Sequence, residues 1–119
     1  MEKDKYLSLI ERLYEKTIDG DRHWKQTYRD TSYLTSFPDF SVMISRHQPA
    51  ENTDWMYTVK IYDSLGEQID GFDETLFQHP PYQESDRKEF HRLMHELYRE
   101  AVVDSRKNSH LDRLLQELA

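Results

Sequence analysis

The chain contains no cysteine and no long hydrophobic run. The absence of cysteine excludes disulfide bonds, a thiol nucleophile and cysteine-ligated zinc, and it is typical of proteins from a reducing compartment. No apolar stretch approaches the roughly 18 residues that a membrane-spanning helix needs. The initial Met-Glu-Lys-Asp-Lys lacks the apolar core of a signal peptide. We therefore expect a cytoplasmic protein that does not bind membranes.

Glycine is also scarce, with only three residues, Gly20, Gly66 and Gly71. A phosphate-cradling loop needs closely spaced glycines, so none is expected. The Gly-x-Ser-x-Gly elbow of serine hydrolases is missing as well. Arg87, Lys88 and Arg92 cluster within 87–92, a patch too small to bind nucleic acid in a chain with a net charge of −7. These absences predict no direct nucleic-acid binding and no enzymatic activity.

Negative charge is concentrated in residues 51–86, which carry nine acidic residues and a single basic one, Lys60. Charge of one sign in one segment creates a local field, which favours a basic partner and repels nucleic acid. Within the segment, Asp70, Asp73 and Glu74 are candidate residues of a docking surface for such a protein partner. A solvated acidic edge is the competing interpretation, and the spacing does not fit a calcium-binding loop.

A length of 119 residues fits a single domain, residues 1–119, and an aromatic content of 13% argues against disorder. The first predicted element is a helix from about Lys3 to Asp19, ended by Gly20. The residues of its broad stripe recur at the i, i+3, i+4, i+7 spacing of one helical face. They are Tyr6, Leu9, Ile10, Leu13, Tyr14, Thr17 and Ile18.

The middle of the chain changes to the two-residue period of β-strands. A strand is predicted at 40–45, and a hairpin follows at about 55–72 with a type I turn at 63–66. A further strand is predicted at 33–37, which residues 24–28 could begin. The connections are too short for crossover helices, so these segments predict an antiparallel sheet of three or four strands.

A second long helix is predicted from about Asp86 to Val103, with Ser85 as its N-cap. Residues 104–110 lack apolar positions and interrupt its stripe. A short final helix is expected after them, capped by Asn108 or Ser109, and one continuous helix is the alternative. The final segment carries four leucines, which are Leu111, Leu114, Leu115 and Leu118.

The expected fold is therefore α+β. An antiparallel sheet of three or four strands has the N-terminal and C-terminal helices packed on one face, and a short extra helix follows at the C-terminus. The opposite sheet face is then partly uncovered. Thr58, Lys60 and Tyr62 lie on it, together with Met56 and Met43. A semi-apolar surface of this kind indicates association with a protein partner or with a second copy of the chain.

Several packing motifs follow one another along the chain. They are a leading helix with Thr17 near its end, Trp24, the strand at 40–44, the run Tyr57-x-Val59-x-Ile61-Tyr62-Asp63-x-x-Gly66-x-x-Ile69, and Leu97-Tyr98-x-x-Ala101 before a leucine-rich tail. This order resembles small α-β-β-β-α domains that are common in bacteria and their mobile elements. The resemblance implies the fold and carries over no catalytic or binding residue. The acidic stretch 70–74 and the following Pro80-Pro81 depart from the pattern.

His91 and His95 lie one helical turn apart and are a candidate pair of metal ligands. A zinc site would need a third ligand, for which His79, Glu96 and His110 are the candidates. The zincin pattern is absent because glutamate does not follow the first histidine. Histidines that flank an apolar stripe commonly pack their rings, so we expect structural roles here and no bound metal or cofactor.

Three functions remain open at this point. The favoured one is a non-enzymatic protein-protein interaction module, a small subunit or regulator in a bacterial or mobile-element system. The first alternative is an acidic inhibitor that mimics nucleic acid and blocks a basic cleft. The second is a metal-dependent enzyme that uses His91 and His95. The predicted partner-binding residues are Asp70, Asp73, Glu74, Thr58, Lys60 and Tyr62.

Overall fold

The computed structural model describes residues 2–29 and 31–119, with side chains for residues 5–29, 31–107 and 113–119. The elements follow in the order α1 (Glu2–Ile18), β1 (Lys25–Gln26), β2 (Ser32–Ser36), β3 (Phe40–His47), β4 (Met56–Asp63), β5 (Gln68–Asp73), the short 3-10 helix η1 (Glu74–Gln78) and α2 (Glu84–Leu118). The five strands form one antiparallel sheet in the order β1-β2-β3-β4-β5. The expected α+β class is confirmed.

The sheet has five strands, where three or four were expected, because β1 is separate from β2. The backbone N–H of Thr27 donates to the carbonyl oxygen of Ser32 at 2.9 Å, which closes a turn between the two strands. Lys25 then pairs with Leu34 across the ladder. Residues 24–28 therefore do not begin β2 but fold back against it as a short edge strand.

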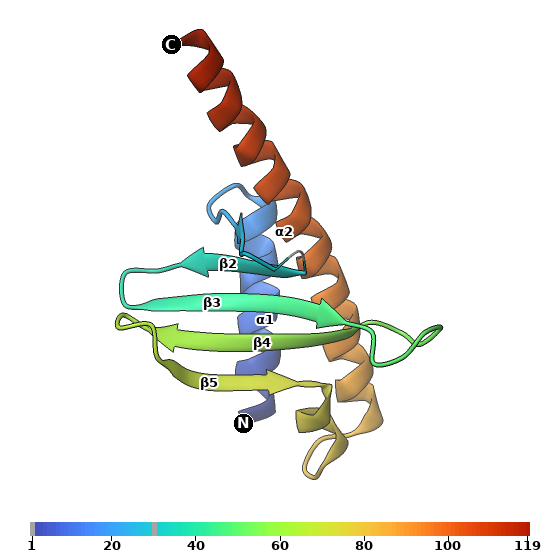
Figure 1. Cartoon of the computed structure of the whole chain (residues 1–119). Helices are drawn as coiled ribbons and strands as arrows, with labels where there is room; N and C mark the ends of the chain where they lie inside the picture. The colour runs from blue at the N-terminus through green and yellow to red at the C-terminus, as the bar shows by residue number, and fades with distance from the viewer. Residues whose placement is uncertain (1, 30) are drawn as a thin grey trace.

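Both helices cover the same face of the sheet, and the core lies between these two layers (Figure 1). Along β3 and β4, buried residues alternate with half-buried ones, as the two-residue period predicts. On the helices, Leu13 is 4% exposed and Leu97 is 0% exposed, so the apolar stripes face the sheet. The core also contains Ile10, Val42, Ile44, Tyr57, Val59, Phe90 and Met94.

The C-terminal helix is one continuous element, so the expected short separate helix is wrong and the continuous alternative is confirmed. Residues 104–110 are polar, but they contain neither proline nor glycine, and polar residues of these types cost a helix little. Asn108 and Ser109 lie in the interior of the helix rather than at its start. The apolar stripe therefore stops at residues 104–110 although the helix continues through them.

The start of α2 also differs from the expectation, since Gln83 is the N-cap and Ser85 lies inside the first turn. The carboxylate of Asp86 accepts a hydrogen bond from the backbone N–H of Gln83 at 2.8 Å. This contact satisfies a backbone donor that has no partner within the helix. It also places a negative charge at the positive end of the helix dipole.

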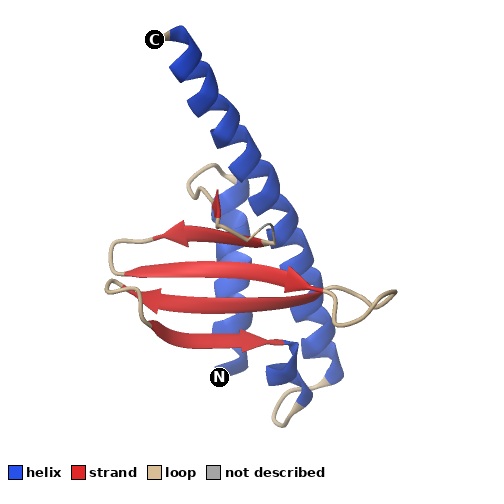
Figure 2. Cartoon of the chain, in the orientation of Figure 1, coloured by secondary structure: helices blue, strands red, loops and turns tan. Residues whose placement is uncertain are grey.

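α2 is longer than the layer that it covers. Its 35 residues extend over about 50 Å, and its C-terminal part projects beyond the β1 side of the sheet (Figure 1). Among the described residues, no strand or second helix accompanies this projecting part (Figure 2). Within the same residues, neither helix combines the length and the apolar character needed to cross a membrane.

Candidate functional site

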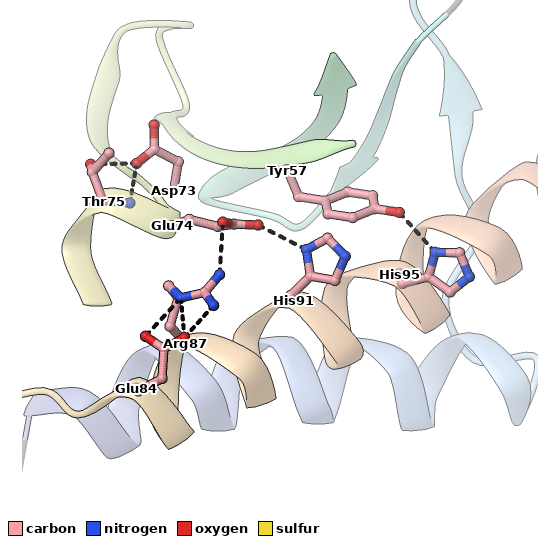
Figure 3. A network of polar contacts seen from close by, with 8 residues as sticks. All are labelled: Tyr57, Asp73, Glu74, Thr75, Glu84, Arg87, His91 and His95. Carbon is pink, nitrogen blue, oxygen red and sulfur yellow. Dashed lines mark hydrogen bonds and ion pairs between the residues drawn. The ribbon is translucent and has the colours of Figure 1, made fainter. Parts of the chain in front are cut away.

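His91 and His95 project from α2 toward β4, where each contacts a different partner (Figure 3). Nδ1 of His91 lies 2.8 Å from a carboxylate oxygen of Glu74, and Nδ1 of His95 lies 2.9 Å from the hydroxyl of Tyr57. The ring of Tyr57 packs edge-on against both imidazoles, with centroids 5.5 and 6.4 Å away. The two histidines thus serve separate contacts and do not converge on a common point.

Among the residues with described side chains, the third ligands considered for a metal do not complete a site with this histidine pair. Glu96 lies 3.3 Å from a guanidinium nitrogen of Arg92, in an ion pair along the exposed side of α2. The side chain of His110 lies outside the described residues. Among the residues with described side chains, no group of three or more His, Cys, Asp or Glu residues could hold a metal ion.

Glu74 lies in the protein interior rather than on a solvent edge. It is 8% exposed, and besides His91 its carboxylate lies 3.6 Å from Nη1 of Arg87. Arg87 also binds Glu84, one turn earlier in α2, and this contact raises the pKa of Arg87 and lowers that of Glu84. A buried carboxylate is costly unless it is paired, so we attribute to Glu74 a role in joining η1 to α2.

The two other acids of the predicted docking surface occupy β5 and its end. Oδ1 of Asp73 accepts a hydrogen bond from the backbone N–H of Thr75 at 2.8 Å, which caps η1. Oδ1 of Asp70 accepts one from the backbone N–H of Gly71 at 2.8 Å and is exposed. β5 is an edge strand, and charged side chains on an edge hinder pairing with another strand. A docking role for Asp70 and Asp73 stays a prediction.

The acidic residues of the segment 51–86 do not form a single patch. Asp54 belongs to the β3–β4 loop, whereas Asp63 and Glu67 flank the β4–β5 turn at the opposite end of β4 (Figure 1). An eight-residue strand spans about 25 Å, and salt screens exposed charges beyond about 8–10 Å. Charge that is contiguous in the sequence is therefore divided in space, which gives no support to a mimic of nucleic acid.

The structure brings Thr58, Lys60 and Tyr62 together on the sheet face opposite the helices. Each is half-buried by its cross-strand neighbours. The pairings are Thr58 with Ser45 and Asp73, Lys60 with Met43 and Gly71, and Tyr62 with Ser41 and Gln68. Serines, a lysine and an aspartate share this face with Met43, Leu34 and Tyr62, so it is mixed in polarity. Its role in binding stays a prediction.

The projecting part of α2 exposes leucines. Asp104 still contacts the rest of the fold, since its carboxylate accepts a hydrogen bond from the backbone N–H of Trp24 at 2.7 Å. Farther along, Leu114, Leu115 and Leu118 are 52%, 67% and 81% exposed. The side chain of Leu111 lies outside the described residues. The leucine pattern was visible in the sequence. That this segment extends past the edge of the sheet was not.

Arg46, near the end of β3, stacks on two aromatic rings beside the histidines. Its guanidinium carbon lies 4.1 Å from the ring centre of Trp55 and 4.6 Å from that of Tyr98. Burial raises the pKa of Tyr57 and of Tyr98, and the nearby charge of Arg46 opposes this effect without cancelling it. Both hydroxyls therefore stay protonated at neutral pH, where neither can act as a base.

A cleft of about 560 Å³, which was not predicted from the sequence, lies beside α1. Its walls include Lys5, Arg12 and Lys16, which follow one another along one flank of α1. Their spacing of seven and four residues places the three on one side of a helix, and this pattern could have been read from the sequence. It was overlooked because acidic residues lie between them in the sequence and conceal the one-sided arrangement.

Comparison with known proteins identifies no relative: no family model matches the chain, and neither does any curated protein or solved structure. The resemblance to small α-β-β-β-α domains of bacteria and mobile elements therefore stays a prediction. The function has to be argued from the geometry of this chain alone.

Proposed function

We propose that this protein is a non-enzymatic protein-interaction module, a small subunit or regulator, whose contact element is the projecting part of α2. The observation that carries the proposal is the exposure of Leu114, Leu115 and Leu118 on a helix that extends past its own sheet. On a helical wheel these three leucines share one face of about 100°. Amphipathic helices commonly bind partners by laying such a face into an apolar groove or against another helix.

The lack of packing at this end of α2 supports the same proposal. Residues 106 and 107 and residues 113–118 are exposed, so tertiary packing contributes little to these side chains. A partner that covers the leucine face would supply the packing that this segment lacks.

The polar residues near η1 support a non-enzymatic interpretation. Glu74 pairs with Arg87 and His91, and His95 contacts the hydroxyl of Tyr57. These contacts join η1 and β4 to α2, which is what the fold requires of them. They account for Glu74, His91 and His95, three of the side chains that the sequence offered for metal or acid–base chemistry.

The test compares two double variants of equal net charge on opposite sides of the projecting helix. Leu115→Glu with Leu118→Glu alters the leucine face, and Arg113→Gln with Gln116→Glu alters the polar side. Affinity capture from the native host and sedimentation of the purified protein would be measured for both variants and the parent.

We expect the parent and the polar-side variant to retain the same partner, or the same self-association, and the leucine variant to lose it. Sedimentation distinguishes a second copy of the chain from another protein. Identical capture and sedimentation for all three proteins would refute the proposal. The binding surface would then have to be sought on the open sheet face around Thr58, Lys60 and Tyr62.

A further inference from the structure

A cleft of about 560 Å³ lies beside α1, between this helix and the connection from β2 to β3. Four of its lining residues are basic and none is acidic, although the whole chain has a net charge of −7. The apolar lining residues come from the helix and from the connection. The lining consists of Lys5, Ser8, Leu9, Arg12, Leu13, Lys16, Arg22 and Phe37.

The apolar part of the cleft is continuous with the core. Leu13 is 4% exposed and belongs to the core cluster, and Leu9 and Phe37 pack against it while remaining half-buried. Leu9, Leu13 and Phe37 therefore form the base of the cleft. Long basic side chains commonly keep their charged ends in water, so the charges belong to its rim. The cleft therefore combines a firm apolar base with a charged rim.

One of the four basic groups is held in place by the fold. Nη1 of Arg22 donates a hydrogen bond to the carbonyl oxygen of Ser36 at 2.6 Å, and the guanidinium carbon lies 4.1 Å from the ring centre of Phe37. A guanidinium has five N–H donors, so this anchoring leaves others to bind an anion. The position of Arg22 is thus set before any ligand arrives.

The other three basic groups come from successive turns of α1. Lys16 makes an exposed ion pair with Asp21 at 3.7 Å. Lys5 and Arg12 make no ion pair with any residue whose side chain the structure describes. Positive charges gathered around an apolar floor repel one another and attract an anion that also carries an apolar body.

We propose that this cleft binds a small amphipathic anion, a carboxylate or phosphate monoester attached to an aliphatic or aromatic body. The body would cover Leu9, Leu13 and Phe37, and the anionic group would meet the guanidinium groups of Arg12 and Arg22. The volume lies within the range of about 300–1,000 Å³ that small-molecule sites occupy. The proposal is independent of the projecting helix and of its partner.

The direct test is a calorimetric titration of the purified protein with decanoate below its micellar concentration. Acetate carries the same charge without the body, and decyltrimethylammonium carries the same body with the opposite charge. We expect decanoate to bind with one-to-one stoichiometry, acetate to bind at least about tenfold more weakly, and decyltrimethylammonium to give no saturable heat. Raising the salt concentration should weaken decanoate binding.

Charge reversal locates the site. Lys5→Glu with Arg12→Glu should weaken decanoate binding by about tenfold or more, because an anion then meets like charge at the rim. The matched control is Lys25→Glu with Lys88→Glu, which changes the net charge equally at exposed positions away from the cleft. Thermal denaturation of both variants checks that the fold is retained.

Three results with decanoate and its analogue, and one with a peptide, would overturn the proposal. The three are equal decanoate affinity for the parent and Lys5→Glu with Arg12→Glu, equal weakening in both double variants, and equal binding of decyltrimethylammonium. A helical peptide of glutamate and leucine that binds where decanoate does not would assign the cleft to a protein segment and also refute the small-molecule proposal.

Discussion

Replacing Glu74 with alanine should destabilise the protein, even though this residue belongs to a segment of clustered acids. Its carboxylate lies 2.8 Å from Nδ1 of His91 and 3.6 Å from Nη1 of Arg87, and the residue is 8% exposed. The substitution would leave both partners without this acceptor, although Arg87 keeps its contact with Glu84. Relief of repulsion among neighbouring acids is small by comparison, because Asp70 and Asp73 are exposed or half-exposed to water.

The size of this loss in the free energy of unfolding follows from the number of contacts that Glu74 makes and from their access to water. A hydrogen bond to a charged group contributes about 1.5–3 kcal/mol. The side chains of Arg87 and His91 are 30% and 35% exposed, so screening reduces what each contact contributes. We expect Glu74→Ala to lower the free energy of unfolding by about 1.5–3 kcal/mol in total. Glu74→Gln keeps one acceptor oxygen and should lower it by about 1 kcal/mol.

The assay is urea denaturation followed by circular dichroism, with Asp70→Asn as the control. Asp70 is exposed and belongs to the same segment, so its substitution removes the same charge and should change the free energy of unfolding by less than about 0.5 kcal/mol. A loss of 2 kcal/mol for Glu74→Ala would lower Tm by roughly 6–10 °C. Equal stability of the parent, Glu74→Ala and Asp70→Asn would refute the structural role of Glu74.

Three further predictions concern the core, the tyrosines and the projecting helix. Leu97→Ala should lower the free energy of unfolding by about 2–5 kcal/mol in urea, because the side chain is fully buried, and a loss below about 1 kcal/mol would contradict the packing. Stability should decline above about pH 10, because burial raises the pKa of Tyr57 above its ordinary value of 10.0 and the unfolded chain loses that proton first. Urea titrations across this pH range should show a shallower decline for Tyr57→Phe. Leu115→Glu with Leu118→Glu should leave the free energy of unfolding within about 0.5 kcal/mol of the parent, whereas a loss near 2 kcal/mol would show that these leucines pack in the free protein.

Periodicity alone was enough to predict most of the fold. The alternation around Val42 and Ile44, the stronger alternation from Trp55 and the helical stripe around Leu13 each require one buried face. Few arrangements of two helices and a sheet bury all of those faces against each other. The one observed places both helices on one side of an antiparallel sheet. Element ends were less well predicted, as Gln83 and the continuous α2 show, because several residues can cap a helix.

The candidate sites depended more on contacts that the sequence does not contain. Glu74 was grouped with Asp70 and Asp73 because the three are close in the chain, but η1 turns Glu74 toward Arg87 and His91. The basic cleft was missed for the opposite reason, since Arg22 joins Lys5 and Arg12 only when the chain folds back along α1. Folding thus gives Glu74 a different environment from its neighbours Asp70 and Asp73, and it brings Arg22 to the cleft that Lys5 and Arg12 line.

The sequence by itself determined the α+β class, the buried faces and the leucine pattern, because these depend on periods of two and 3.6 residues within single elements. Only the tertiary structure decided that Leu114, Leu115 and Leu118 lie past the sheet, that the acids of 51–86 lie at both ends of β4, and that four basic residues line one cleft. The physical reason is that surface fields and binding sites arise between elements. Such fields and sites depend on the distances between elements and on the burial of side chains, which packing sets. The periodicity of a single element carries no information about either.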